Sequence, residues 1–348
     1  MLLASSITPS GAVWAESAAR KAMSTAHVVD LGEFSDHPCV AEFSESFCVT
    51  GASRVSGDVA GALASVRRTA LLLAAFDVAN SRVDPTVVVV DGSVPELVSD
   101  ACSFSALLQV SAAETPLAQR AKTMSDALAG GDVEWIVVAP PERAAMDSVT
   151  VQVAQGCALG LRVAGVLVAP MPRKRDGWPN KIRRSARGLV EQLQDRLFDI
   201  PVQRSRAGKV PVFSSRAARG IEPRGAGPLS VTISPESASL SDLSSESDGG
   251  HVLSVTIPGL QYCDVEVGVW SQDPSYPSTH IVLRIDGVIA RIELDSTLRR
   301  CVAVEAVVAG DSIAVSFRAD PAQWPEPRAS SGASDQADEQ VGEREREA

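Results

Sequence analysis

The chain has 348 residues, 45% of them hydrophobic, which is enough for one large domain and a smaller one. Its net charge of −11 argues against non-specific binding to nucleic acid, because the phosphate backbone requires a basic protein face. No stretch reaches the ~18–20 consecutive apolar residues of a membrane helix, and the first residues lack the basic start of a signal peptide. We therefore expect a cytoplasmic protein without a transmembrane segment.

The six cysteines and four histidines are scattered along the chain, and no two cysteines form a CxxC pair. A zinc site needs clustered ligands, so we expect no metal site. A disulfide framework is typical of short secreted chains. We therefore interpret the cysteines as small buried side chains in a reducing compartment.

The first 213 residues alternate short apolar runs with longer amphipathic segments. The runs, Ala26–Val29, Val87–Val90, Trp135–Ala139 and Val163–Val168, are typical of strands in a parallel sheet covered on both faces. Helices are predicted over Val59–Ala79, Leu117–Leu128, Ala144–Leu159 and Ile182–Phe198. In the first of these, we expect core positions at Leu63, Val66, Ala70, Leu73 and Ala74. The alternation predicts an α/β domain over residues 1–213.

The rest of the chain changes character twice. Residues 214–250 are rich in Ser, Gly, Pro and Asp, which predicts a flexible linker. Residues 251–325 then alternate with period two, which predicts five or six short strands in a small antiparallel β-sandwich. The strands are expected at Val252–Ile257, Val265–Trp270, Ile281–Ile285, Ala290–Leu294 and Ile313–Phe317. Residues 326–348 are acid-rich and lack aromatic residues, which predicts a disordered tail.

Two stretches resemble the family of arsenical-pump and tail-anchored-protein-targeting ATPases. Ser312–Trp324 (SIAVSFRADPAQW), together with the earlier Pro258-Gly259 turn, is similar to the small heat-shock-protein-like domain that ends many actinobacterial members. Trp135–Arg143 (WIVVAPPER) resembles the family's strand ending in Pro-Glu, and Val163–Phe198 resembles its adenine-side strand, basic loop and following helix. The resemblance implies a P-loop-NTPase-like, mostly parallel sheet with helices on both faces.

The resemblance places the family's phosphate-binding loop at Ser6–Ala12 (SITPSGA), between a strand at Leu2–Ser5 and a helix at Val13–Met23. Such a loop holds phosphates with glycine backbone N–H groups and a lysine. Here Gly11 is present, but there is no lysine, and Pro9 lacks a backbone donor. The loop is therefore degenerate.

Other family positions are changed as well. The attack-positioning aspartate falls near Gly32, with Glu33 beside it, and the asparagine that contacts adenine falls at Ala169. Asp91 matches the family's metal-side switch aspartate; its structural alternative is a carboxylate that caps the following helix. The resemblance thus implies a vestigial nucleotide site of Ser10, Gly11 and Asp91, with no catalytic residue and with ATP and Mg²⁺ bound at reduced affinity or not at all. Because phosphoryl transfer depends on positioning and charge stabilisation, these losses predict a pseudo-ATPase.

Three functions are compatible with this pattern. The favoured one is a non-catalytic partner or regulatory subunit of an intact family ATPase, in a homo- or heterodimer. Any peripheral membrane association would then go through the partner. The second is a weak ATPase with an unconventional loop around Ser10, Gly11 and Asp91. The third is a client-binding, chaperone-like protein that uses its sandwich and exposes an apolar groove. The seven cations of Arg173–Arg187 predict a surface for an acidic partner or a bound anion; the alternative is a solvated basic loop.

Overall fold

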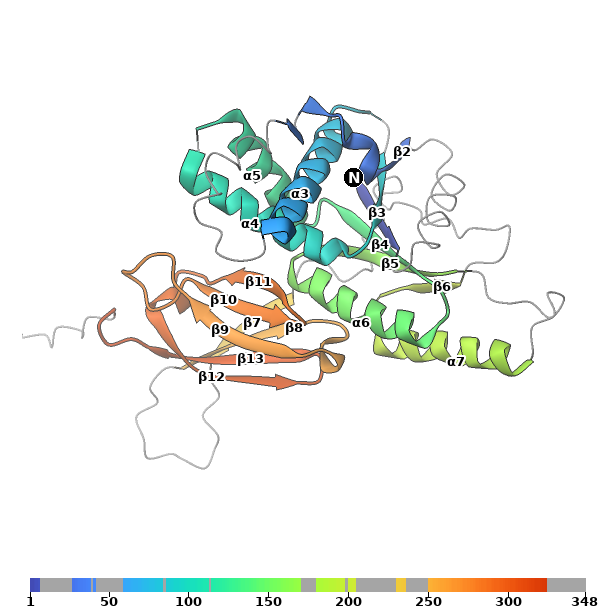
Figure 1. The fold of residues 1–348 in the computed structure, drawn as a ribbon. Helices are drawn as coiled ribbons and strands as arrows, with labels where there is room; N and C mark the ends of the chain where they lie inside the picture. The colour runs from blue at the N-terminus through green and yellow to red at the C-terminus, as the bar shows by residue number, and fades with distance from the viewer. Residues whose placement is uncertain are drawn as a thin grey trace, which may run out of the picture.

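The computed structural model describes residues 1–6, 27–38, 40–41, 59–83, 86–112, 114–169, 180–197, 200–204, 230–235 and 250–323. Within them, a six-stranded parallel sheet is flanked by helices, and two antiparallel sheets pack as a β-sandwich (Figure 1). The predicted fold class, an α/β domain of the P-loop-NTPase type with a C-terminal β-sandwich, is confirmed.

The parallel sheet has the strand order β2-β3-β1-β4-β5-β6. Its strands are β1 (Leu2–Ser6), β2 (His27–Asp30), β3 (Thr86–Asp91), β4 (Glu134–Ala139), β5 (Arg162–Val168) and β6 (Val202–Arg204). The four valines of β3 are all buried, as are Trp135 to Ala139 of β4. Burial on both faces explains why these strands are uninterrupted apolar runs in the sequence.

The helices are α3 (Val59–Asn80), α4 (Val94–Ala112), α5 (Pro116–Ala129), α6 (Arg143–Ala158) and α7 (Asn180–Arg196), with a short 3₁₀ helix, η1 (Leu31–Phe34). Helix α4 has no counterpart among the predicted helices. The core positions predicted in α3 are buried except Leu63, whose exposed fraction is 48%. That prediction was wrong for Leu63 because the buried part of α3 begins about one turn later, at Val66.

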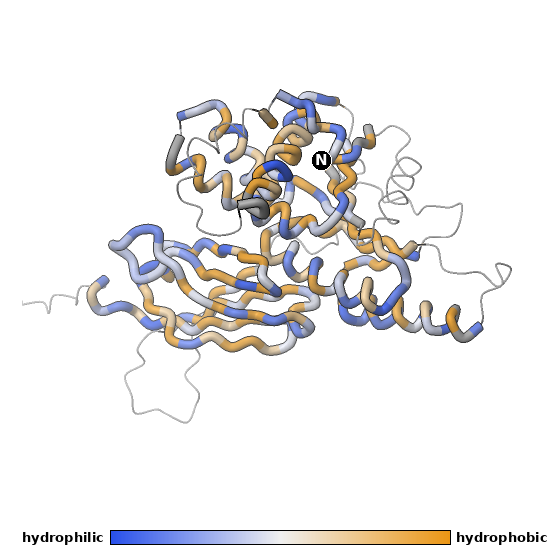
Figure 2. Tube along the Cα trace, in the orientation of Figure 1, coloured by the Kyte–Doolittle hydropathy of each residue, from blue (hydrophilic) through white to orange (hydrophobic). Residues whose placement is uncertain are grey.

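The sandwich consists of a three-stranded sheet, β11-β10-β9, and a four-stranded sheet, β12-β13-β8-β7. Its strands are β7 (Ser230–Pro235), β8 (His251–Thr256), β9 (Val265–Trp270), β10 (His280–Ile285), β11 (Val288–Glu293), β12 (Cys301–Ala309) and β13 (Ser312–Ala319). Two 3₁₀ helices, η4 (Leu260–Tyr262) and η5 (Leu298–Arg300), lie in its connections. Figure 2 shows the alternation of apolar and polar residues along these strands.

Strand β7 lies inside the segment 214–250 that the sequence predicts as a linker. It pairs antiparallel with β8, with Val231 opposite Val255 and Ile233 opposite Leu253. For residues 230–235 the linker prediction was wrong, because SVTIS carries the apolar alternation of a strand within a polar stretch. The other linker residues before Gly250, and the acidic tail 326–348, lie outside the described residues.

The sandwich is packed directly against the α/β domain, with α6 between the parallel sheet and the sandwich (Figure 1). The Gln155 side-chain amide donates a 3.0 Å hydrogen bond to the Ile285 carbonyl oxygen, and Ser99 Oγ of α4 donates to the Ile289 carbonyl oxygen at 3.3 Å. Gly259, before η4, lies against Thr150 and Leu197. Buried apolar residues of both parts form one continuous core.

Candidate functional site at the carboxyl edge of the parallel sheet

The candidate site lies where β1 and β3 end. The two strands are parallel neighbours, and their register places Ser6 opposite Asp91. In open α/β sheets, ligands bind outside the carboxyl ends of the strands, where connections diverge to the two sides. The predicted loop that follows Ser6, with Ser10 and Gly11, lies outside the described residues. Of the three predicted site residues, the structure therefore places Asp91 alone.

Asp91 is exposed at the end of β3. Among the described residues, no hydrogen bond or ion pair involves its carboxylate. The alternative role for this residue was to cap the next helix. Ser93 does this instead, because the backbone N–H of Glu96 in α4 donates to Ser93 Oγ at 3.3 Å. Gly92 makes the turn between Asp91 and Ser93, with a φ of 109° that favours glycine. Asp91 is thus an exposed carboxylate at the carboxyl edge of the sheet, and no described residue bonds to it.

The carboxylates after β2 are occupied by local bonds. Asp30 Oδ1 accepts from the backbone N–H of Gly32 at 2.8 Å, and Glu33 Oε1 accepts from the backbone N–H of Asp30 at 3.2 Å. This reciprocal pair caps η1. Strand β3 separates β2 from β1. Both carboxylates therefore stabilise the start of a helix beside the site.

The opposite side of the edge is formed by the ends of β4 and β5. The backbone N–H of Ala169 donates to the Ala139 carbonyl oxygen at 2.8 Å and holds the two strand ends together. The methyl group of Ala169 offers no hydrogen bond to a nucleotide base. Glu142 lies at the start of α6, where its side chain makes no capping hydrogen bond. It is a carboxylate that sequence reasoning did not assign to the site, and the Pro-Glu ending of WIVVAPPER was the available signal.

Cations lie at the beginning of α7, which follows β5. Because α7 connects the carboxyl end of β5 to the start of β6, its first turn lies toward the carboxyl edge. Arg184 and Arg187 are exposed about one and two turns after the start of the helix. Residues 173–179 of the predicted basic segment lie outside the described residues. Ala186 and Leu193 of α7 and Leu197 just after it are buried, whereas Ile182 is 43% exposed.

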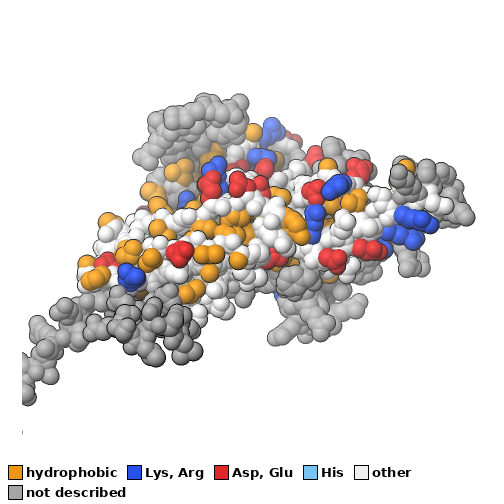
Figure 3. Space-filling view, turned by 90° about the horizontal axis from the view of Figure 1, so that it is seen from below, with side chains coloured by type: hydrophobic (Ala, Val, Ile, Leu, Met, Phe, Trp, Pro, Cys, Tyr) orange, Lys and Arg blue, Asp and Glu red, His pale blue; other side chains and the backbone are white. Residues whose placement is uncertain are grey.

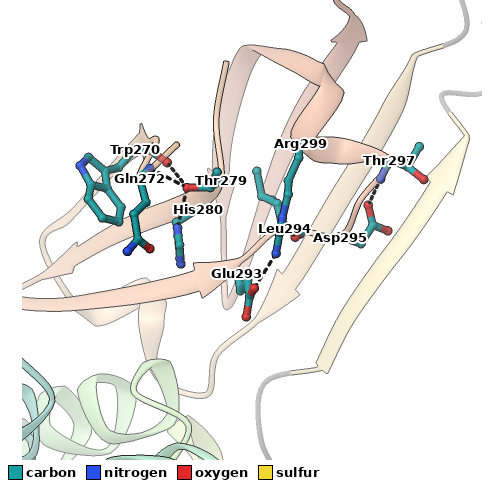
Figure 4. Close-up of polar contacts among 9 residues, drawn as sticks. All are labelled: Trp270, Gln272, Thr279, His280, Glu293, Leu294, Asp295, Thr297 and Arg299. Carbon is teal, nitrogen blue, oxygen red and sulfur yellow. Dashed lines mark hydrogen bonds and ion pairs between the residues drawn. The ribbon is translucent and has the colours of Figure 1, made fainter. Parts of the chain in front are cut away.

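A second polar cluster lies on the sandwich (Figure 4). The Thr279 hydroxyl lies 2.9 Å from His280 Nδ1 and accepts the backbone N–H of Gln272 at 2.9 Å. Arg299 pairs with Glu293 and donates to the Leu294 carbonyl oxygen at 2.8 Å. Burial lowers the pKa of His280, and the nearby arginines oppose the raising effect of Glu293. These bonds connect strand ends and turns within the sandwich, so we interpret the cluster as stabilising the fold.

Four cysteines lie in the described part of the chain. Cys157 and Cys301 are buried, as expected, whereas Cys102 and Cys263 are half-buried. Burial raises the pKa of the Cys157 thiol and of the Cys263 thiol to about 12. Within the described ranges, no three His, Cys, Asp or Glu side chains are grouped closely enough to hold a metal ion. None of the helices in this part of the chain combines the length and apolarity that crossing a bilayer requires.

The chain matches no family model, and no curated protein matches it.

Proposed function

We propose that this protein is a non-catalytic member of the arsenical-pump ATPase family that acts as a partner or regulatory subunit of an intact, lysine-bearing ATPase. The observation that carries the proposal is the position of Ser6. This residue ends the central strand β1 and lies opposite Asp91 of β3. This is where an α/β sheet of this type binds phosphates, yet the loop sequence SITPSGA has no lysine.

The residues around Asp91 support nucleotide binding without ATP hydrolysis. An exposed carboxylate at this edge suits a magnesium ion carried by a nucleotide. Hydrolysis would also need charge stabilisation and an oriented water, and the nearest carboxylates after β2 are bonded to η1. The exposed cations of α7 support association with an acidic surface through charge-assisted contacts.

The first test is an ATPase assay of the purified full-length protein with Mg²⁺. We expect no hydrolysis above a buffer control in the wild type. Asp91→Asn should weaken any binding of a fluorescent ATP analogue, whereas Asp132→Asn should not, because Asp132 is an exposed aspartate that precedes β4 at the opposite edge of the sheet. Turnover that disappears with Asp91→Asn would show that the protein is an enzyme.

The second test measures association with a co-expressed, lysine-bearing relative by size-exclusion chromatography. The double variant Arg184→Glu/Arg187→Glu should weaken the complex and slow its formation. Arg67→Glu/Arg82→Glu makes the same charge change at exposed positions on and after α3 and serves as the control. If the wild-type protein does not co-elute with the relative, the proposed partnership is wrong.

A further inference from the structure

Strand β12 is an edge strand of the sandwich with an unusual number of exposed valines. It is bonded to β13 on one side and ends the sheet on the other. Val302, Val304, Val307 and Val308 have exposed fractions of 45%, 58%, 48% and 42%. Glu305 is the one charged residue of the nine in β12. Figure 3 views the molecule from below, the side of β12 and β13 in Figure 1, and shows apolar side chains gathered there.

The free edge of β12 presents backbone groups in a defined pattern. A two-residue turn, Gly310-Asp311, joins Ala309 to Ser312, and the φ of 59° at Gly310 fits the first position of such a hairpin turn. Ala309 and Ser312 therefore form a hydrogen-bonded pair, and the pairs alternate from there along the ladder. The N–H and C=O groups of Ala306 and Val308 consequently point away from β13. Among the described residues, nothing bonds to them along that edge.

Natural edge strands carry features that prevent pairing with another chain, such as lysines, prolines, short length or bulges. Strand β12 has nine residues and neither lysine nor proline. Its bulge lies between Ala303 and Glu305, so Glu305–Ala309 remains a regular, open segment. The chain's own last segment is a poor cover for it, because residues 325–348 contain a single valine and no leucine, isoleucine or aromatic residue.

We propose that β12 pairs with β12 of a second copy of this chain, antiparallel across a two-fold axis at Val307. In this register Ala306 of one copy faces Val308 of the other, so the outward backbone groups of both strands satisfy one another. Glu305 faces Ala309 of the second copy, and no two charges of equal sign are opposed. The two four-stranded sheets become one sheet of eight strands. This surface is separate from the carboxyl edge of the parallel sheet.

The first experiment determines the mass of the full-length protein by light scattering across a concentration series. We expect a dimer that dissociates on dilution, and a monomer for Val307→Lys at the same concentrations. Val110→Lys is the matched control, since Val110 is an 80% exposed valine on α4. Val307→Thr keeps a strand-forming residue without adding charge and should retain part of the dimer. It is the control for the case in which the lysine variant fails to fold.

A second experiment tests the register by oxidative cross-linking. At the axis the two Val307 residues form a pair without mutual hydrogen bonds, with Cα atoms about 4.5 Å apart, a spacing that a disulfide spans. Val307→Cys should therefore yield a covalent dimer on mild oxidation. Glu305→Cys should not, since the two copies of residue 305 would be about 13 Å apart along the strand, four residues at about 3.3 Å each.

Three outcomes would overturn the proposal. The first is a wild-type protein that stays monomeric at every concentration. The second is a dimer that Val307→Lys and Val110→Lys affect equally. A dimer that is lost in Arg184→Glu/Arg187→Glu but kept in Val307→Lys would locate self-association at the carboxyl edge of the parallel sheet and would likewise exclude β12. Failure here leaves the proposed ATPase partnership intact, because that partnership uses a different surface and is measured with a different protein.

Discussion

The indole nitrogen of Trp135 donates a 2.9 Å hydrogen bond to Ser5 Oγ, and both side chains are fully buried. The two residues lie on neighbouring parallel strands, since Leu3 of β1 is opposite Trp135 of β4. The ring lies directly under α6, where Gly156 has no side chain. A Cβ at this glycine would lie 2.4 Å from the ring. Strands β1 and β4 and helix α6 thus contact one another at the side chain of Trp135.

Replacing Gly156 with alanine should destabilise the protein. The new methyl group would overlap the Trp135 ring, and overpacking in a core typically costs ~1–3 kcal/mol. Gly188→Ala in α7 is the control, because a Cβ there meets nothing within 4 Å. That change should instead stabilise the protein by about 0.5–1 kcal/mol, through the helix preference for alanine over glycine. Urea unfolding measures the change in the free energy of unfolding for each variant. Equal changes in the two variants would contradict the packing of α6 on Trp135.

Replacing Ser5 with alanine should also lower the free energy of unfolding. The indole N–H would stay buried without an acceptor, a loss of about 1–3 kcal/mol. Ser185→Ala, at an exposed position on α7, should change stability little. Urea unfolding measures the difference between the two variants. A neutral Ser5→Ala would mean that the indole finds another acceptor.

The sequence predicts the parts of this fold that depend on uninterrupted or alternating apolar patterns. Val87–Val90 and Trp135–Ala139 are strands of the sheet because burial on both faces demands such runs. Strand β7 escaped prediction because its two apolar residues lie within a polar stretch, and only pairing with β8 orders them. The docking of the sandwich was also missed, since it depends on single side chains such as Gln155 rather than on a periodic pattern.

The candidate site was predictable only in part. Asp91 could be assigned because it ends a clear strand, and strand order then places it beside Ser6. The roles of Asp30 and Glu33 could not be read from spacing, because reciprocal capping of η1 requires the backbone geometry of the turn. The same holds for Ser93, which replaces Asp91 as the residue that caps α4.

Stability should fall on acidification in a way that depends on His280. Burial lowers its pKa in the folded protein below the ordinary value of 6.5. The unfolded chain therefore binds this proton more readily, so the contribution of neutral His280 is complete above pH 6.5 and is lost as the pH falls through the lowered pKa. The free energy of unfolding of His280→Gln should change less with pH across this window. His251→Gln, on β8, provides the comparison, and identical pH profiles for the wild type and His280→Gln would contradict the assignment.

Gln155 should couple the sandwich to the α/β domain in unfolding. Its side-chain amide, on the buried side of α6, donates to the carbonyl oxygen of Ile285 at 3.0 Å and reaches that of Asp286 at 3.4 Å. Because the core is continuous across this contact, we expect the wild type to unfold in urea as one cooperative transition. Gln155→Met keeps the volume and removes the donor, so it should cost about 0.5–1.5 kcal/mol, the net value of one hydrogen bond.

Gln155→Glu is the sharper variant of the same contact. At neutral pH it would aim a carboxylate at two carbonyl oxygens in a buried position, so its cost should exceed that of Gln155→Met. Acidification protonates this carboxylate and restores a donor, so the gap between the two variants should narrow at low pH. A transition that splits in two, with a smaller dependence on urea in each step, would show that the sandwich has detached while both parts remain folded. If Gln155→Glu unfolds like the wild type, the sandwich is held to α6 by its apolar contacts, and Gln155 contributes nothing to docking.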